Sequence, residues 1–583
     1  MRRRTAARLS ILTVILAAAC ARTPLPRTNL AVTSADARWV EKTLRRLTLE
    51  EKVGQLVACR FTGTFRNLDS PELAALRELI VRSRVGGVIL FGGEVYETAS
   101  LTNLFQSWAK LPLLIASDFE RGVGNQVTNA TLFPPLMALG AAGSEELAYE
   151  MGRATAIEGR AMGVHMTYAP VVDVTVNPLN PIINTRSVGE DPALVGRIAR
   201  AFIRGCQENG MVATAKHYPG HGDTDQDSHT QLPTIAADRE RLERVELYAF
   251  RQAVEAGVQA IMSSHLFVPA LDPTPGLPAT LSPAIMTDLL RNKIGFKGLL
   301  VTDAMGMAGV AQGFRPEEAA TRAILAGIDM ILLPPEPARV VTHLVTEARA
   351  GRLPLKRIDE AVRRILTVKA RLGLPRQRFV DIGALTTRIA PQTRLEQARK
   401  SFEAAVTLVR NEGRLLPFPP GRRLVVLSLS SDPGDYFAGR VFVQEMIKRH
   451  PGSAAFYADG DTGKETLDEA AAKAAAADAV VIALFSRLSA GKGSVDLEPK
   501  HVAFIEQLAA AGPPVVVVSF GSPYFLRHFP GVDAYVCLYR NTPETQPIAA
   551  RALCGELDVG GKLPVSLPGL YPVGHGLTLT KAR

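Results

Sequence analysis

The densest group of reactive side chains lies in one segment, residues 216–233, with the sequence KHYPGHGDTDQDSHTQLP. Three histidines, three aspartates and a lysine fall within its first fourteen residues. Glycine and proline near its start exclude a regular helix or strand there, so we expect a loop. Asp227 and His229 are two positions apart, a spacing that allows an aspartate to orient an imidazole and stabilise its protonated form. Such a pair can donate and accept a proton near neutral pH.

A metal site is the alternative for this loop, because histidine and aspartate are common metal ligands. The loop contains neither an H-x-H nor an H-E-x-x-H spacing, and Lys216 would bring a cation beside the metal. Acid–base chemistry is therefore the favoured interpretation. For His229 alone, an ordinary solvated loop histidine is the alternative.

Asp303 is the second candidate for chemistry, in the segment GFKGLLVTDAMGM at 295–307. It follows an apolar run that is typical of a buried strand. A carboxylate in such a place can attack an electron-poor carbon, and an anomeric centre is the best fit. A helix N-cap is an equally good interpretation of this residue taken alone.

These residues need a scaffold, and the first 375 residues contain a regular alternation of short apolar runs and helical patterns such as 144–162 and 239–256. The runs occupy 55–61, 85–91, 111–117, 166–172, 211–215, 258–263, 298–302 and 328–333. Eight such runs predict an α/β fold of the (β/α)8 TIM-barrel type. Polar residues fall at the C-terminal ends of the runs, where such a barrel has its active site: Asp118, Asp173, Lys216, His217, His265 and Asp303.

The alternation resumes beyond a segment of mixed Pro, Gly, Thr and charge, which we expect to be a linker at 376–397. Further apolar runs at 424–429, 479–484, 514–519 and 534–538, with a helical stretch at 465–477, predict a smaller open parallel α/β sheet within 398–583. This part has no Walker or dinucleotide glycine fingerprint, which favours an accessory domain. The barrel domain is expected at 41–375.

The N-terminus indicates export. Residues 1–10 are basic, 11–19 are apolar and Cys20 follows three alanines, a pattern that predicts a signal peptide at 1–19 and a tether at 20–40. The segment resembles a bacterial lipoprotein signal, although Ala17 stands where leucine is usual. We therefore expect lipidation of Cys20 and a place at the cell envelope, in the periplasm or at the outer membrane of a Gram-negative cell. Plain secretion is the alternative.

Composition excludes several classes of protein. Hydrophobic residues make up 47% and charged residues 21%, which argues against a disordered, collagenous or polytopic membrane chain. The net charge is +10, but four arginines of the expected signal peptide contribute to it, so +6 remains in the mature chain. This excess is too weak to imply a nucleic-acid partner.

The loop 216–229 resembles the K-H-x-P-G-x-G-x-x-x-x-D-S-H signature of the glycoside hydrolase family 3 β-N-acetylglucosaminidases. Similar segments extend over nearly the whole mature chain: 48–56, 86–91, 169–192, 295–303, 326–333, 411–417 and 560–568. The resemblance implies that Asp303 is the nucleophile and that His229, paired with Asp227, is the general acid/base. It also implies that sugar hydroxyls are bound by Asp118, Arg186, Lys216 and His217.

One segment departs from the family pattern. Where the family usually has D-Q-E-G-G-R-V, this chain has Asp118-Phe-Glu-Arg-Gly-Val-Gly124, so the arginine is displaced. A substrate contact usually made by that arginine is therefore expected to differ here.

The resemblance implies a retaining exo-β-N-acetylglucosaminidase that acts on peptidoglycan-derived or related glycans such as muropeptides, and requires no metal or organic cofactor. A β-glucosidase or β-xylosidase of the same fold is the nearest alternative, although such relatives usually take the acid/base carboxylate from the second domain. A catalytically silent, membrane-tethered glycan-binding protein is an alternative of another class. The sequence indicates no protein partner.

Overall fold

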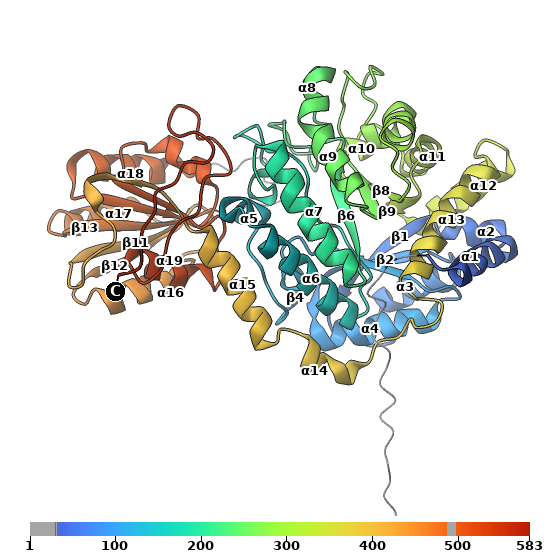
Figure 1. Ribbon diagram of the computed structural model, residues 1–583, viewed down its shortest axis with the longest axis horizontal. Helices are drawn as coiled ribbons and strands as arrows, with labels where there is room; N and C mark the ends of the chain where they lie inside the picture. The colour runs from blue at the N-terminus through green and yellow to red at the C-terminus, as the bar shows by residue number, and fades with distance from the viewer. Residues whose placement is uncertain (1–29, 31, 487–496, 583) are drawn as a thin grey trace, which may run out of the picture.

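The computed structural model describes residues 30, 32–486 and 497–582, which form two α/β domains side by side (Figure 1). The expected signal peptide and Cys20 lie outside these residues. Within them, no helix is both long and apolar enough to cross a membrane.

The first domain is the predicted barrel of eight parallel strands. Its strands are β1 (Val57–Gly63), β2 (Gly87–Glu94), β3 (Leu114–Ser117), β5 (Met166–Thr167), β6 (Val212–Tyr218), β7 (Ala260–Ser263), β8 (Leu299–Ala304) and β9 (Met330–Leu332). Pairing of β1 with both β2 and β9 closes the barrel, and the short β4 (Val127–Thr128) extends from β2. Every residue of β6 is buried, as expected for a parallel strand that is covered on both faces.

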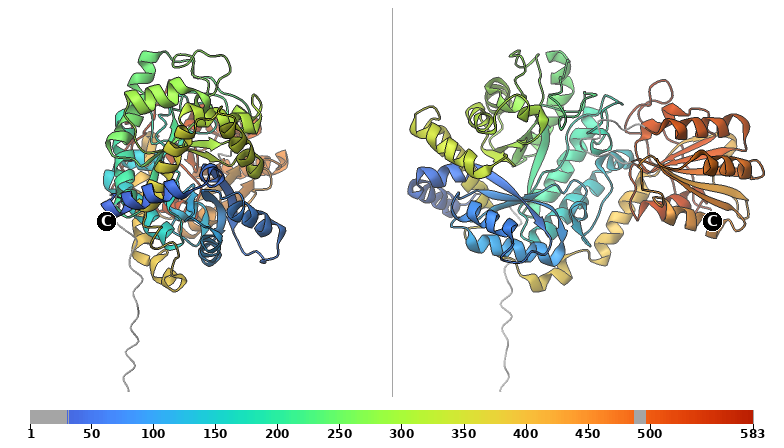
Figure 2. Two further views of the ribbon diagram at one scale, coloured as in Figure 1. Left: turned by 90° about the vertical axis from the view of Figure 1, so that its right-hand side faces the viewer. Right: turned by 180° about the vertical axis from the view of Figure 1, so that it is seen from behind.

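Helices surround this barrel (Figure 2). They are α1 (Ser34–Arg46), α2 (Leu49–Gly54), α3 (Pro71–Val81), α4 (Val95–Trp108), α5 (Leu136–Ala142), α6 (Glu145–Ala161), α7 (Pro192–Glu208), α8 (Arg239–Arg244), α9 (Glu246–Glu255), α10 (Ala308–Ala311), α11 (Pro316–Ala326), α12 (Pro337–Arg349) and α13 (Leu355–Arg371), with a π-helix at Ala284–Lys293. Local signals set their ends. The side chain of Ser144 caps α6, and Asp191 followed by proline starts α7.

The second domain is a six-stranded sheet in the order β10-β15-β14-β13-β11-β12. Its strands are β10 (Thr407–Asn411), β11 (Leu424–Ser430), β12 (Ala454–Ala458), β13 (Ala479–Phe485), β14 (Val515–Ser519) and β15 (Ala534–Cys537). Two apolar cores cover it, one with α17 (Lys464–Ala474) and α18 (Pro499–Ala511), the other with α16 (Arg440–Arg449) and α19 (Thr545–Leu553). The sheet was expected to be purely parallel, but its edge strand β10 is antiparallel to β15.

The domains are joined by a folded segment and by direct contact. The expected linker at 376–397 contains α14 (Leu385–Arg388) and the first turns of α15 (Gln392–Ala405), which leads into β10. Met137, Ala138 and Ala141 of α5 pack into one core of the second domain. The barrel and the second sheet therefore share buried apolar surface.

Two further elements differ from expectation. The predicted helix at 239–256 is divided at Val245, where the backbone departs from ideal helical angles (φ −111°, ψ −79°). The next residue, Glu246, is buried beside Arg241 and Gly220, so tertiary contacts accompany this break. The end of the expected tether is also ordered: α1 begins at Ser34, and its Asp36 binds Arg376.

Candidate active site

A cavity of about 550 Å³ lies at the C-terminal ends of the barrel strands. Six of the seven predicted site residues line it: Asp118, Arg186, Lys216, His217, His229 and Asp303. The seventh, Asp227, is buried and contacts His229. The structure thus brings together residues that are distant in the sequence, and the imidazole of His229 shares one cavity with the carboxylate of Asp303.

The Asp227–His229 pair is formed within the loop that follows β6, at residues 219–233. Asp227 Oδ1 lies 2.7 Å from His229 Nδ1 and also accepts a hydrogen bond of 2.8 Å from the backbone N–H of His229. A carboxylate can only accept here, so Nδ1 carries the proton and Nε2 is the atom that can exchange one. The Asp227 side chain is fully buried, whereas that of His229 is 36% exposed.

Asp303 lies at the end of β8, where its Oδ1 accepts a hydrogen bond of 2.7 Å from the backbone N–H of Ala304. Burial alone would raise the pKa of this carboxyl group. The neighbouring His217 and His265, the Ala304 N–H and Lys216 outweigh burial and lower the pKa below its ordinary value. Asp303 is therefore ionised, as a nucleophile must be.

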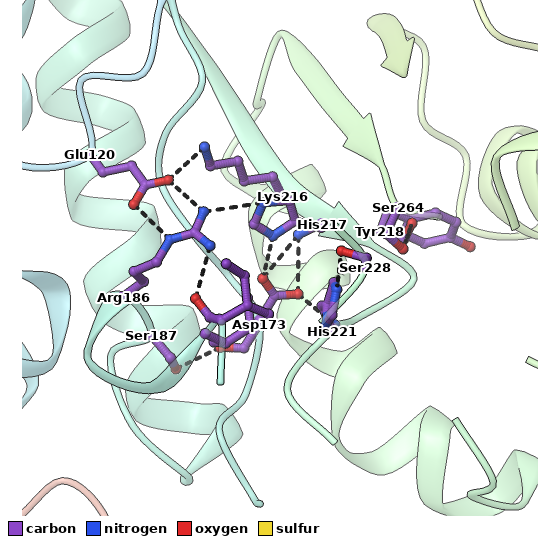
Figure 3. Close-up of polar contacts among 12 residues, drawn as sticks. Glu120, Asp173, Arg186, Ser187, Lys216, His217, Tyr218, His221, Ser228 and Ser264 are labelled. Atoms are coloured by element: carbon purple, nitrogen blue, oxygen red, sulfur yellow. Dashed lines mark hydrogen bonds and ion pairs between the residues drawn. The ribbon is translucent and has the colours of Figure 1, made fainter. Parts of the chain in front are cut away.

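Four charged side chains form a network on the adjoining wall, and Figure 3 shows Glu120, Arg186 and Lys216 of this network. Lys216 Nζ, which is nearly buried, lies 2.7 Å from both Asp118 Oδ1 and Glu120 Oε1. Arg186 binds Glu120 through two hydrogen bonds of 2.8 and 3.0 Å. Burial raises the pKa of Glu120, but the charges of Arg186 and Lys216 lower it well below its usual range. The result is a rigid set of donors and acceptors, which suits a polyhydroxylated ring.

Asp173 binds both the end of β6 and the loop that follows it, below this network (Figure 3). Its carboxylate binds His217 Nδ1 at 2.6 Å and accepts from the backbone N–H of His221 at 2.7 Å. His221 Nε2 in turn lies 2.9 Å from Ser228 Oγ, next to His229. Burial lowers the pKa of His221 to about 4, so this imidazole is neutral and acts as a support for the loop.

Sequence reasoning gave no role to two residues that matter in this geometry. Glu120 joins Lys216 to Arg186, and its position two residues after Asp118 at the end of β3 was the available signal. Arg540 of the second domain also lines the cavity. It lies just beyond β15, and ligands of open α/β sheets bind at the C-terminal ends of strands.

In the described parts of the chain, no group of three or more His, Cys, Asp and Glu side chains is arranged for a metal ion.

One cavity at this end of the TIM barrel contains a carboxylate, an oriented imidazole and a polar network. This arrangement is consistent with a glycosidase active site. Two family models match the chain: the glycosyl hydrolase family 3 N terminal domain over residues 48–368 and the family 3 C-terminal domain over 406–572. The chain belongs to glycoside hydrolase family 3, which confirms the resemblance seen in its sequence.

Characterised relatives agree with this membership. The chain is 30% identical over 549 residues to a beta-N-acetylglucosaminidase/beta-glucosidase of Cellulomonas fimi, covering 90% of this chain and 95% of the relative. It is similar to a family 3 beta-N-acetylglucosaminidase from Paenibacillus sp. (TM-score 0.78, 32% identity, 89% of this chain and 99% of that one). It is also similar to the beta-glucoside phosphorylase BglX (TM-score 0.82, 27% identity, 92% and 97%).

Proposed function

We propose that this protein is a retaining exo-β-N-acetylglucosaminidase that removes terminal N-acetylglucosamine from peptidoglycan-derived or related glycans. The observation that carries the proposal is that Asp303 and the Asp227-bound His229 line one cavity together with the predicted sugar-binding residues. The names of the Cellulomonas and Paenibacillus relatives support the choice of aminosugar. The cavity volume of about 550 Å³ lies within the usual range of ligand pockets, about 300–1,000 Å³.

In the first step, Asp303 attacks the anomeric carbon while Nε2 of protonated His229 gives its proton to the departing glycosidic oxygen. The bond from carbon to the leaving oxygen breaks as the bond to Asp303 forms. In the second step, neutral His229 takes a proton from water, whose oxygen attacks the same carbon and releases Asp303. The sugar leaves with its original configuration after two inversions.

A histidine suits this acid/base role for an electrostatic reason. Most retaining glycosidases pair two carboxylates, which repel each other when both are ionised. Here Asp118, Glu120 and Asp303 already bring three carboxylates to the cavity wall. An imidazole as the proton donor adds no fourth negative charge to the wall.

The Asp303→Asn variant tests the proposal, because it keeps the shape of the side chain and removes the nucleophilic charge. We expect loss of turnover of p-nitrophenyl N-acetylglucosaminide with an unchanged circular dichroism spectrum. Asp288→Asn is the matched control, since Asp288 is exposed on the π-helix and should be dispensable. For the wild type, proton NMR should detect the β-anomer as the first product. Near-normal turnover by Asp303→Asn, or initial release of the α-anomer, refutes the assignment.

β-Glucosidase activity is the second candidate, and the double name of the Cellulomonas relative favours it. Among the described residues of the second domain, Arg540 is the one that lines the cavity, and no carboxylate from that domain does. Comparing kcat/KM for p-nitrophenyl N-acetylglucosaminide and p-nitrophenyl glucoside separates the two activities.

We also propose export and attachment to the cell envelope through lipidated Cys20. The basic, apolar and small-residue pattern of residues 1–20 supports this. The mass of the mature N-terminal peptide would identify a diacylglyceryl group on Cys20 or its absence.

A further inference from the structure

Three buried basic side chains belong to the N-terminal end of the barrel, opposite the catalytic cavity. Arg160 is in the last turn of α6, His165 immediately precedes β5, and Lys369 is in the last turn of α13. Arg160 is 8% exposed, His165 2% and Lys369 0%. None of them takes part in the mechanism above.

Hydrogen bonds bring these side chains to one place. Arg160 Nη2 donates a hydrogen bond of 3.1 Å to the backbone carbonyl of Leu372, three residues after Lys369. Lys369 Nζ donates one of 2.6 Å to Oε1 of Gln55, which ends α2 just before β1. The charges of Arg160 and Lys369 both lower the pKa of His165, so both cations lie near this imidazole.

The group offers more hydrogen-bond donors than the protein satisfies. In the described part of the chain, Nε and Nη1 of Arg160 are buried without a hydrogen-bond partner. The backbone N–H of Ile115 donates to His165 Nδ1 at 3.1 Å, so the neutral imidazole carries its proton on Nε2 and can donate from there. Lys369 has three donors, of which the bond to Gln55 uses one. Buried donors without acceptors destabilise the folded state.

Among the described residues, no carboxylate balances the charges of Arg160 and Lys369. Burial alone lowers their pKa values, to about 10 and about 7, whereas a nearby carboxylate would raise them. Glu158, two residues before Arg160, binds Arg394 at 2.8 Å instead. The carbonyl of Leu372 at the end of α13 offsets part of the charge of Arg160. Arg160 nevertheless remains a permanent, buried cation with two unpaired N–H groups.

We propose that Arg160, His165 and Lys369 form a buried site for a small monovalent anion such as chloride, which stabilises the N-terminal end of the barrel. The ion accepts hydrogen bonds from Arg160 and His165 and compensates the charge of the guanidinium. An anion suits this group better than water, because it only accepts, whereas water would turn its own hydrogens toward other donors. The inference goes beyond the proposed function and does not depend on it.

Thermal unfolding of the full chain tests this site, with sodium gluconate replacing sodium chloride at constant ionic strength. Gluconate has the same charge and is too large for a buried site. For a Kd of about 2 mM, the melting temperature should rise by about 3 °C between about 2 and about 200 mM chloride. Arg160→Met and Lys369→Met retain apolar bulk and remove the charges, and each should lose at least half of this rise.

Arg394→Met is the matched control. Arg394 is as buried as Arg160, but it is paired with the carboxylate of Glu158. We expect this variant to lower the melting temperature in every buffer and to leave the chloride-dependent rise unchanged. An equal loss of the rise in Arg394→Met would show that the response is not specific to the proposed site.

A measurement on the wild type makes the test independent of how well the variants fold. Crystals soaked in sodium bromide should show an anomalous scattering peak within hydrogen-bond distance of Arg160 Nε or Nη1. The site is refuted if the wild-type melting temperature does not respond to chloride, if bromide does not occupy this position, or if both charge-removing variants keep the full rise.

Discussion

Replacing Asp227 by asparagine leaves His229, the proposed acid/base, in place but removes the carboxylate that orients its imidazole. Asparagine keeps an oxygen that can accept from the His229 backbone but removes the charge 2.7 Å from Nδ1. At that separation and an effective dielectric constant of about 20, the attraction between imidazolium and carboxylate is about 6 kcal/mol. Because the His229 side chain is 36% exposed, screening by water reduces this to about 3 kcal/mol. That energy corresponds to about a hundredfold in rate.

The loss should depend on the leaving group. A sugar alcohol must be protonated as it departs, so we expect kcat/KM of Asp227→Asn on a disaccharide of two N-acetylglucosamine units to fall about a hundredfold. p-Nitrophenolate leaves without a proton, so its first-turnover release should fall less than about tenfold. Azide, which needs no general base, should then restore steady-state turnover by forming a glycosyl azide.

Stopped-flow absorbance at the p-nitrophenolate band measures the first turnover, and chromatography of the released sugar measures the disaccharide reaction. Asp225→Asn is the matched control, because Asp225 is exposed in the same loop. An equal loss on both substrates, or no loss on the disaccharide, would show that His229 does not protonate the leaving oxygen.

Two further predictions concern stability and binding. Glu120→Gln leaves Lys216 and Arg186 as adjacent cations, so we expect KM to rise and the free energy of unfolding in urea to fall by about 3 kcal/mol; an unchanged KM would contradict the sugar-binding role. Burial raises the pKa of Glu246 from 4.5 to about 7, despite Arg241 at 2.9 Å. Between these pH values the folded state holds a proton that the unfolded chain has released, so stability should decrease as pH rises, by about 3 kcal/mol in total. Glu246→Gln should flatten that part of the urea-unfolding profile, and an unchanged slope would contradict the shift.

The barrel was predictable because most residues of its strands belong to buried apolar runs, and because parallel strands must be covered on both faces. In the second sheet, sequence reasoning missed β10 and β12, which lie at its two edges. The residues of β12 are mostly half-exposed, so its apolar pattern is weak. The antiparallel direction of β10 depends on the route of α15, which no local pattern encodes.

The candidate site was predictable where its residues follow strands or lie in one loop. The C-terminal ends of parallel barrel strands converge, so Asp118, Lys216 and Asp303 had to face a common mouth. No comparable rule predicts from the sequence which residues of a second domain will reach the cavity of the barrel. Arg540 comes from another sheet, and its direction depends on the left-handed conformation of Tyr539, which sequence alone does not indicate.

The contact between the domains gives the second sheet a structural role beside the barrel. Glu190, four residues after Arg186, accepts hydrogen bonds of 2.8 Å from both the backbone N–H and the hydroxyl of Ser566. Its own N–H donates to the carbonyl of Pro564, and a Cβ at Gly189 would lie 2.4 Å from that oxygen. Glycine is therefore required at 189 for this approach. The second domain thus supports the segment that carries Arg186, and through Arg186 it supports Glu120 and the wall of the cavity.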